Sequence, residues 1–175
     1  MENNQKAAVY WFFGLSGSGK SSLSALLFDQ LRSMGKSVVK LDGDQLRAGL
    51  NSDLGFTSED RLENIRRAAE LAKLFLDNEQ IVLASFITPE EIHREKVREI
   101  LGDSVQFIFV DATLETCQSR DVKGLYRDAS NGDLGNFTGI SAPFERPSRA
   151  EFILDTNLHS KESCLNQLMQ QFFSL

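Results

Sequence analysis

The sequence predicts an α/β fold with three layers, in which a mostly parallel sheet is covered by helices on both faces. Short apolar runs alternate with stretches of helical periodicity along the 175 residues, a pattern typical of consecutive βαβ units. The first apolar run leads directly into Gly14–Ser21, whose glycines and lysine have the spacing of a phosphate-binding P-loop. Since 41% of the residues are hydrophobic, we expect one domain spanning residues 1–175.

Five apolar runs are expected to form buried strands. They do not alternate polar with apolar residues, which is typical of parallel strands covered on both faces. The expected strands are Val9–Phe13, Val38–Leu41, Ile81–Phe86, Val105–Val110 and, as a fifth, Phe152–Leu154. Parallel strands need crossover connections, and the segments between these runs are long enough to contain helices.

Helical periodicity is found between these strands. The expected helices are Lys20–Met34, Ser58–Asn78, Glu90–Leu101, Thr113–Ser119 and a terminal helix Lys161–Phe173. In the second of them, Ile65, Ala69, Ala72 and Leu76 form an apolar stripe that is expected to face the core. Residues 121–149 contain glycines, prolines and many polar residues, so we expect them to form a mobile lid over the carboxyl edge of the sheet.

The segment Gly14–Ser21 lies between a strand and a helix, which is the context that a P-loop requires. Glycines let the backbone wrap around an anion, and the N–H groups of the following helix terminus point at it. Lys20 would reach the β- and γ-phosphates, and Ser21 would bind Mg²⁺. A loop that only joins a strand to a helix needs neither residue. The segment therefore predicts binding of a nucleoside triphosphate with Mg²⁺.

Composition restricts the class of partner. A net charge of −6 argues against a large surface for nucleic acid or an anionic membrane, but permits a local basic pocket for a small anion. Cys117 and Cys164 lack metal-ligand spacing and are too few for a disulfide framework. The run ending at Phe13 leads into the P-loop and is not expected to be a signal peptide. No apolar stretch approaches the roughly 20 residues that cross a bilayer, so a cytoplasmic location is expected.

A P-loop alone does not separate a GTPase, an ATPase motor and a small-molecule kinase. A polar cluster, Leu41–Arg47, follows the second strand and is expected at the same sheet edge as the P-loop. Of Asp42 and Asp44, one could orient or deprotonate an acceptor hydroxyl and the other could hold Mg²⁺. Arg47 could neutralise an anionic substrate. The alternative is an Asp-Gly turn with a solvated arginine.

A second cluster surrounds the start of the longest expected helix. Arg61 and Asn64, off the apolar stripe, could bind an anion and a base or sugar. Phe56 follows a glycine and is either an aromatic wall for a nucleobase or a loop anchor. Arg66 and Arg67 could belong to the same site or pair with acidic neighbours.

A third cluster lies in the expected lid. Lys123 could cover the transferring phosphoryl group when the lid closes, because added cations and excluded water favour this reaction. Phe137 could stack on a base. Taken alone, a lysine in a polar loop is more often merely solvated.

Together, these residues resemble the adenylyl-sulfate kinase family from about Val9 to Thr156, with the motifs in the family's order. Members of that family have a P-loop kinase fold. They transfer the γ-phosphate of ATP to the 3′-hydroxyl of adenosine 5′-phosphosulfate (APS). The resemblance implies an ATP-dependent phosphotransferase of sulfate assimilation that uses Mg²⁺, has APS as its small-molecule substrate and forms a homodimer.

The resemblance also implies which residues bind the two nucleotides. ATP would be bound by Gly14, Leu15, Ser16, Gly17, Ser18, Gly19, Lys20, Ser21 and Ser22, with Arg120, Thr156 and His159 beside its base. APS would be bound by Asp42, Asp44, Arg47, Phe56, Arg61, Asn64, Ile87, Thr88, Lys123, Asn136 and Phe137. The implied catalytic residues are Lys20, Asp44, Lys123 and Thr88, and the implied Mg²⁺ ligands are Ser21 and Asp42.

Within the APS site, the resemblance implies three roles. Phe56 and Phe137 would sandwich the adenine. Arg47 and Arg61 would hold the phosphosulfate group. Asp44 would face the 3′-hydroxyl.

One segment departs from the family pattern. The family usually has serine, proline and an aromatic residue, often followed by arginine, where this chain has Thr88-Pro89-Glu90-Glu91. The family serine is commonly described as an active-site residue that could carry a phosphoryl group. Thr88 keeps a hydroxyl, but we favour its interpretation as a helix N-cap, with Glu91 completing a capping box. Two glutamates near an anionic ligand could weaken sulfate binding or indicate a different acceptor nucleotide.

Two alternatives therefore stay open. A kinase of the same fold could act on another nucleotide conjugate, or the chain could be a regulatory module that binds nucleotide without phosphoryl transfer. A guanine-reading Asn-Lys-x-Asp motif is absent from the sequence, which disfavours the second alternative. His93 and His159 have no spacing that indicates a metal site and are expected at the surface.

Overall fold

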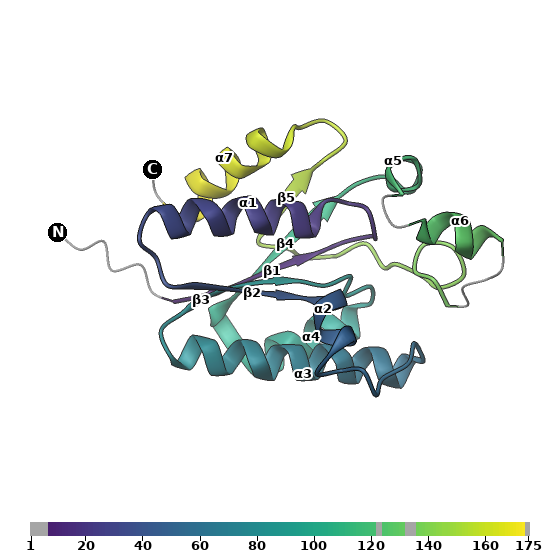
Figure 1. The fold of residues 1–175 in the computed structure, drawn as a ribbon, viewed down its shortest axis with the longest axis horizontal. Helices are drawn as coiled ribbons and strands as arrows, with labels where there is room; N and C mark the ends of the chain where they lie inside the picture. Colours follow the sequence, from purple (N-terminus) through teal and green to yellow (C-terminus); the bar gives the residue numbers. More distant parts are fainter. Residues whose placement is uncertain (1–6, 122–123, 132–135, 174–175) are drawn as a thin grey trace.

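The structure is a computed structural model that describes residues 7–121, 124–131 and 136–173. A five-stranded sheet lies between two layers of helices (Figure 1). Its strands are β1 (Val9–Phe13), β2 (Val38–Asp42), β3 (Ile81–Ser85), β4 (Val105–Asp111) and β5 (Phe152–Asp155). They pair in parallel in the order β2-β3-β1-β4-β5. The predicted three-layer α/β fold and its strands are confirmed.

Four helices cover the sheet (Figure 1). One face carries α1 (Lys20–Ser33) and α7 (Lys161–Phe172), and the other carries α3 (Ser58–Asp77) and α4 (Glu91–Leu101). A single 3-10 turn, Gly102–Ser104, follows α4. The helix α5 (Leu114–Arg120) lies beyond the carboxyl ends of the strands. The five predicted helices are confirmed to within one or two residues at each end.

The central strand β1 divides the core into two clusters. Successive side chains of a strand point to opposite faces of the sheet. Trp11 and Phe13 pack with α3 and α4, whereas Tyr10 and Phe12 pack with α1 and α7. The register pairs Trp11 with Ala84 of β3 and Phe107 of β4. Burial on both faces explains why these runs lack alternation and places the end of β1 at the middle of the site edge.

Two short helices were not predicted. The first, α2 (Gly43–Ala48), begins directly after β2, where the Asp42 carboxylate accepts a hydrogen bond from the Asp44 backbone N–H at 2.9 Å. The second, α6 (Leu125–Ser130), lies within the expected lid, and the Asp121 carboxylate accepts hydrogen bonds from the backbone N–H groups of Tyr126 and Arg127. Each spans less than two turns, so hydrophobic periodicity gives no signal for it.

The second half of the expected lid is attached to the body of the molecule. The Glu145 backbone N–H donates to the Pro89 carbonyl at 2.8 Å, and Arg146 forms an ion pair with Asp111 at the end of β4. These contacts hold the chain across the carboxyl edge of the sheet, as the sequence predicts. The mobility of the lid stays a prediction.

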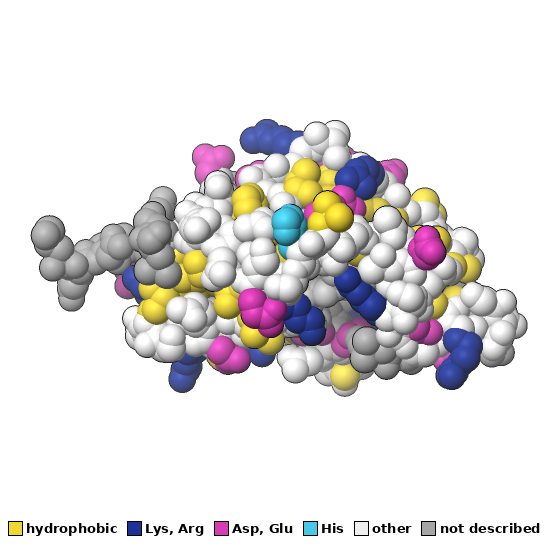
Figure 2. Space-filling view, turned by 90° about the horizontal axis from the view of Figure 1, so that it is seen from above, with side chains coloured by type: hydrophobic (Ala, Val, Ile, Leu, Met, Phe, Trp, Pro, Cys, Tyr) yellow, Lys and Arg dark blue, Asp and Glu magenta, His cyan; other side chains and the backbone are white. Residues whose placement is uncertain are grey.

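The surface carries charges of both signs, and Figure 2 shows Lys and Arg side chains interspersed with Asp and Glu side chains on one face. Within residues 7–121, 124–131 and 136–173, no helix is long and apolar enough to span a membrane.

Candidate active site

The P-loop connects β1 to α1 and has the backbone that its glycines permit. Gly14 and Gly17 have φ angles of 145° and 76°, a region that side chains with a Cβ rarely adopt. A Cβ on Gly14 would lie 2.5 Å from the carbonyl oxygen of Val110. The loop therefore needs glycine at Gly14 for both conformation and space, and it directs the N-terminus of α1 toward the sheet edge.

Lys20 is the first residue of α1 and is buried within the P-loop. Its Nζ donates hydrogen bonds to the carbonyl oxygens of Gly14 at 3.0 Å and Leu15 at 2.6 Å. The ammonium group thus lies against the loop in which phosphate oxygens would bind. Ser22 is exposed on the first turn of the same helix.

Ser21, in the first turn of α1, meets Asp42, the last residue of β2, as the sequence predicts for a metal site. Ser21 Oγ donates a hydrogen bond to Asp42 Oδ2 at 2.6 Å. A hydroxyl and a carboxylate oxygen are the hard ligands that Mg²⁺ prefers, and this ion usually takes its other ligands from water and phosphate. The donor set fits a nucleotide-bound Mg²⁺. Asp44 is exposed on the first turn of α2, beside this pair.

Two arginines surround an exposed aromatic ring. Phe56 is 57% exposed, and the guanidinium carbons of Arg47 and Arg61 lie 4.4 Å and 6.0 Å from its ring centroid. Partial burial lowers the pKa of both guanidinium groups, and the nearby charge of Arg61 adds to this effect on Arg47. Two like charges held together next to an aromatic face favour an anion attached to a planar base.

Backbone contacts hold both arginines in this cluster. Arg47 Nη1 donates to the Gly55 carbonyl at 2.8 Å, and Arg61 Nε donates to the Phe56 carbonyl at 3.1 Å. Arg61 also donates from Nη1 to Thr138 Oγ1 at 2.9 Å and from Nη2 to the Asn136 carbonyl. Arg61 therefore connects the loop that carries Phe56 with the segment that carries Phe137.

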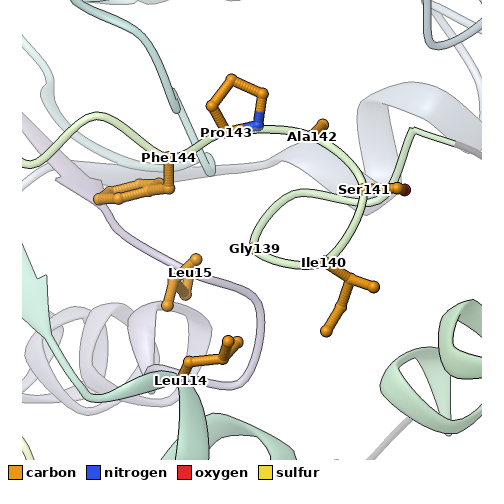
Figure 3. A pocket seen from close by; sticks show the side chains of 8 residues that line it. All are labelled: Leu15, Leu114, Gly139, Ile140, Ser141, Ala142, Pro143 and Phe144. Carbon is orange, nitrogen blue, oxygen red and sulfur yellow. The ribbon is translucent and has the colours of Figure 1, made fainter.

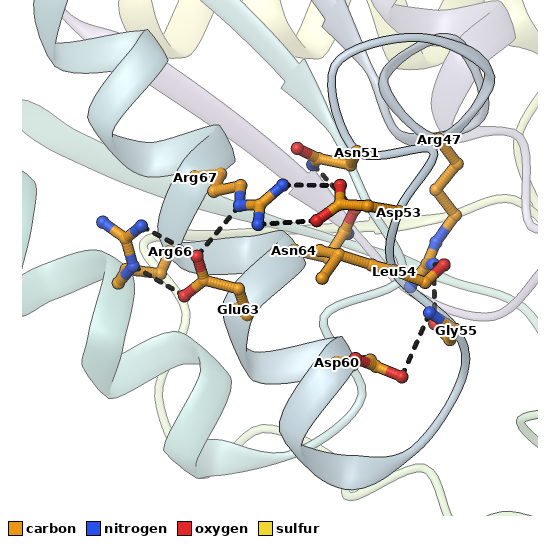
Figure 4. A network of polar contacts seen from close by, with 10 residues as sticks. All are labelled: Arg47, Asn51, Asp53, Leu54, Gly55, Asp60, Glu63, Asn64, Arg66 and Arg67. Atoms are coloured by element: carbon orange, nitrogen blue, oxygen red, sulfur yellow. Dashed lines mark hydrogen bonds and ion pairs between the residues drawn. The ribbon is translucent and has the colours of Figure 1, made fainter.

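Two other arginines of α3, Arg66 and Arg67, form ion pairs with acidic side chains (Figure 4). Arg67 contacts Asp53 at 2.7 Å and Glu63 at 2.9 Å, and Arg66 contacts Glu63 at 2.7 Å. The pair between Arg67 and Asp53 attaches the loop before α3 to the helix, whereas the pairs with Glu63 lie within α3. The interpretation of Arg66 and Arg67 as partners of acidic neighbours is confirmed.

Asn64 is 5% exposed, and its Oδ1 accepts a hydrogen bond from Asn51 Nδ2 at 2.9 Å. Figure 4 shows this pair beneath the loop that leads to Gly55. Only the amide NH₂ group of Asn64 is left to contact an acceptor. Asn64 thus supports the loop of the site, and its direct role in binding stays a prediction.

Thr88 does not cap α4, and this prediction was wrong. The helix begins at Glu91, its N-cap is Glu90, and His93 Nδ1 accepts from the Glu90 backbone N–H at 3.2 Å. Thr88 is 1% exposed with φ 45°, and its Oγ1 accepts from Trp11 Nε1 at 2.9 Å. Its hydroxyl is thus bound inside the protein, which favours a positioning role over a covalent one.

His93 is buried rather than at the surface, so that expectation was also wrong. Burial lowers the pKa of His93, and Nδ1 accepts a hydrogen bond, so the ring is neutral. The missed signal is its position three residues after the N-cap. By contrast, His159 is exposed, as predicted.

The two glutamates of the departing segment differ. Glu91 contacts Arg94 at 2.9 Å and Arg98 at 3.2 Å, so its carboxylate is paired with two arginines of α4. Burial lowers the pKa of Arg61, and the charge of Glu90 opposes this shift. The Glu90 carboxylate lies 4.0 Å from His93 Nδ1. Of the two, Glu90 is the one that acts on the arginine cluster.

Arg120 and Thr156 contact each other and the P-loop, and their position beside the base of ATP stays a prediction. Arg120 Nη1 contacts the carbonyls of Gly17 at 3.3 Å and Ser18 at 3.4 Å, and Nη2 donates to the Thr156 carbonyl at 2.7 Å. Thr156 Oγ1 donates to the Ser18 carbonyl at 2.9 Å. On the other side of the loop, the Ile87 carbonyl accepts from the Gly14 N–H at 3.3 Å.

The lid residues of the predicted site are only partly described. Phe137 lies in a small hydrophobic cluster, and Asn136 provides a carbonyl to Arg61. Lys123 lies outside the described residues.

A groove of about 500 Å³ opens next to the P-loop (Figure 3). It is lined by Leu15, Leu114 and the segment 139–144. Figure 3 shows the Leu15 and Leu114 side chains on one side of the groove and the segment 139–144 on the other. The Leu15 side chain therefore faces the lid, so its predicted part in ATP binding would come from its backbone.

Known proteins are similar to this chain. A family model described as adenylylsulphate kinase matches residues 6–155. The chain is 47% identical to an adenylyl-sulfate kinase of Clostridium kluyveri over 165 residues, which is 94% of this chain and 83% of that protein. It is 46% identical to an adenylyl-sulfate kinase of Bacillus licheniformis over 170 residues, 97% of this chain and 86% of that protein.

A solved structure agrees with these relatives. The Mycobacterium tuberculosis APS kinase CysC, determined in complex with AMPPNP and APS, superposes with a TM-score of 0.93 at 39% identity. The match covers 97% of this chain and 99% of that chain. The P-loop, the carboxylates after β2 and the arginine–phenylalanine cluster thus occur in a chain that belongs to the adenylylsulphate kinase family.

Proposed function

We propose that this protein is an adenylyl-sulfate kinase, which transfers the γ-phosphate of ATP to the 3′-hydroxyl of APS. The observation that carries the proposal is the position of two arginines around exposed Phe56, at the same sheet edge as the P-loop. One site suits the phosphates of a donor nucleotide, and the other suits an anionic nucleotide as acceptor. The M. tuberculosis relative, whose structure contains AMPPNP and APS, supports the same pair of ligands here.

In the transfer step, the 3′-oxygen of APS attacks the γ-phosphorus while the bond to the ADP oxygen breaks. The hydroxyl proton leaves toward Asp44 or water, and the products are ADP and 3′-phosphoadenylyl sulfate. Lys20 would stabilise the charge on the transferring group, because phosphoryl transfer depends mainly on positioning and electrostatics.

The protein would bind APS at both of its ends, the phosphosulfate group and the adenine. Arg47 and Arg61 would hold the phosphosulfate group, and the adenine would lie between Phe56 and Phe137. Arg120, Thr156 and His159 would lie beside the base of ATP. Lys123 stays an expectation from the sequence.

Ser21 and Asp42 would hold Mg²⁺, since their oxygens already meet at 2.6 Å. The ion supplies charge neutralisation between the β- and γ-phosphates when it is bound. The protein's own contribution is to hold the hydroxyl and the carboxylate oxygen together, with Ser21 directly following Lys20 in α1. The resemblance further supports a homodimer in the cytoplasm, and light scattering of the purified protein would test the dimer.

The test measures ADP release from ATP in the presence of Mg²⁺ in three separate assays. One contains APS, one contains another nucleotide conjugate from a panel, and one contains no acceptor. We expect fast turnover with APS at micromolar concentration. Turnover only with another conjugate would assign a different acceptor, and acceptor-independent hydrolysis alone would indicate a regulatory module.

A second arm of this test concerns the P-loop. Lys20→Ala is expected to lower kcat by about 100-fold or more, because removing one group that stabilises transition-state charge has an effect of this size. Circular dichroism checks that the variant is folded. Unchanged turnover would show that the P-loop does not bind the donor.

A further inference from the structure

Tyr126 contacts both halves of the proposed active site. It lies on α6, is 3% exposed and packs edge-to-face against Phe137 with ring centroids 5.0 Å apart. Its hydroxyl donates a hydrogen bond to the carbonyl oxygen of Ser16, in the P-loop, at 2.8 Å. One side chain therefore joins the predicted wall of the acceptor site to the predicted donor site.

The surroundings of Tyr126 form a third hydrophobic cluster, separate from the two that cover the sheet. Tyr126, Ala112 and Cys117 are its buried members, and Leu15, Leu114 and Phe137 pack against them. A Cβ on Gly139 would lie 3.1 Å from Leu15 and 3.3 Å from Leu114, so the lid chain lies directly on the P-loop (Figure 3). Of two consecutive P-loop residues, Leu15 thus packs against the segment that carries Phe137, and Ser16 accepts the hydrogen bond from Tyr126.

The hydrogen bond from Tyr126 sets the direction of a peptide group in the P-loop. Burial raises the pKa of Tyr126, so its hydroxyl stays protonated and donates. A peptide group is planar and trans, so its C=O and N–H point in opposite directions. Holding the Ser16 carbonyl toward Tyr126 therefore turns the Gly17 N–H the other way. Phosphate binding by such a loop depends on how its N–H groups point.

We propose that Tyr126 is a positioning residue that couples occupation of the acceptor site to phosphate binding by the P-loop. An acceptor base stacked on Phe137 restrains the Tyr126 ring, and the hydroxyl then holds the Ser16–Gly17 peptide in the orientation that binds ATP. Because such coupling is reciprocal, bound ATP also favours the acceptor. The inference rests on the proposed function, since it requires Phe137 to contact the acceptor.

The test uses Tyr126→Phe, which keeps the ring against Phe137 and removes only the hydroxyl. The dissociation constant of APS is measured by calorimetry with and without a non-hydrolysable ATP analogue. The coupling is measured by the ratio of the dissociation constant without the analogue to the dissociation constant with it. We expect this ratio to fall by about three- to tenfold in the variant, the effect of one lost hydrogen bond.

Two further variants keep the test decisive. Tyr10→Phe, in the only other tyrosine of the sequence, lies in the cluster that packs with α7 and should keep the wild-type ratio. Phe137→Leu should weaken APS binding and also lower the ratio, and adding Tyr126→Phe to it should lower the ratio no further. If Tyr126→Phe does not fold, Phe137→Leu alone carries the test.

The outcomes are distinct. A wild-type ratio in folded Tyr126→Phe would overturn the inference, and if that variant does not fold, a wild-type ratio in Phe137→Leu would overturn it. Absence of APS binding to the wild-type protein would overturn the proposed function instead.

Discussion

At the scale of single residues, the acceptor site depends on the balance of charge around Arg61. Arg47 and Arg61 lie around one phenylalanine ring, and Glu90 acts on Arg61 from the start of α4. Glu91 is paired with Arg94 and Arg98. A carboxylate near an anion-binding arginine weakens the attraction for the anion, so we expect Glu90, rather than Glu91, to affect binding of the acceptor.

Glu90→Gln is therefore expected to lower KM for APS by about two- to fivefold, the effect of one exposed charge, with little change in kcat. Steady-state kinetics at fixed, saturating ATP measures this. Glu91→Gln is the matched control, and it should lower the melting temperature through the loss of its two ion pairs without lowering KM. An equal fall of KM in both variants would contradict the assignment.

At the same scale, Thr88 shows why residue roles were harder to predict than residue positions. Its environment is set by Trp11, which is 77 positions away in the sequence, and by Arg94, whose Nη1 donates to the Thr88 carbonyl at 3.1 Å. A local pattern of threonine, proline and glutamate is typical of a helix start. Local patterns carry no information on a partner that is distant in the sequence, so the pattern did not predict this environment. The helix begins at Glu91 instead.

At the scale of elements, the site is built where strands end and helices begin. The P-loop follows β1, Asp42 ends β2 and is the N-cap of α2, and Thr156 follows β5. In parallel sheets these ends meet at one edge, so the elements bring together residues far apart in sequence. The short helices α2 and α6 complete this edge.

Gly14→Ala tests the backbone of this edge. The substitution adds a Cβ at φ 145° that would lie 2.5 Å from the Val110 carbonyl, so the loop must shift. We expect a loss of about 1–3 kcal/mol in the free energy of unfolding, measured by urea denaturation, and weaker ATP binding. Gly35→Ala is the control, because Gly35 also has positive φ, 75°, but has nothing within 4 Å of the added carbon. A Gly35→Ala variant with equally weakened ATP binding would contradict the steric argument.

At the scale of the whole molecule, stability in acid depends on the ion pairs that Glu63 forms with Arg66 and Arg67 within α3. Arg66, then Arg67, lowers the pKa of Glu63 from 4.5 to about 2 through hydrogen bonds to its carboxylate. A carboxyl group whose pKa is lower in the folded state stabilises the fold above its unfolded value. This contribution is present above pH 4.5 and is lost as the pH falls toward about 2.

Glu63→Gln is therefore expected to flatten the dependence of stability on pH between about 4.5 and about 2. Urea denaturation across this range measures it. Glu95→Gln, at an exposed position of α4, controls for the loss of one negative charge. A wild-type slope in Glu63→Gln would show that the pairs with Arg66 and Arg67 do not stabilise the fold.

The sequence by itself determined the fold class, the five strands, the long helices and the P-loop. These follow from local periodicity and from the spacing of Gly14, Lys20 and Ser21, which are properties of neighbouring residues. Only the tertiary structure decided that Asn64 lies beneath the loop, that Thr88 binds Trp11 and that Tyr126 reaches the P-loop. Each of these depends on a contact between distant segments, which burial and hydrogen bonding select once the chain has folded.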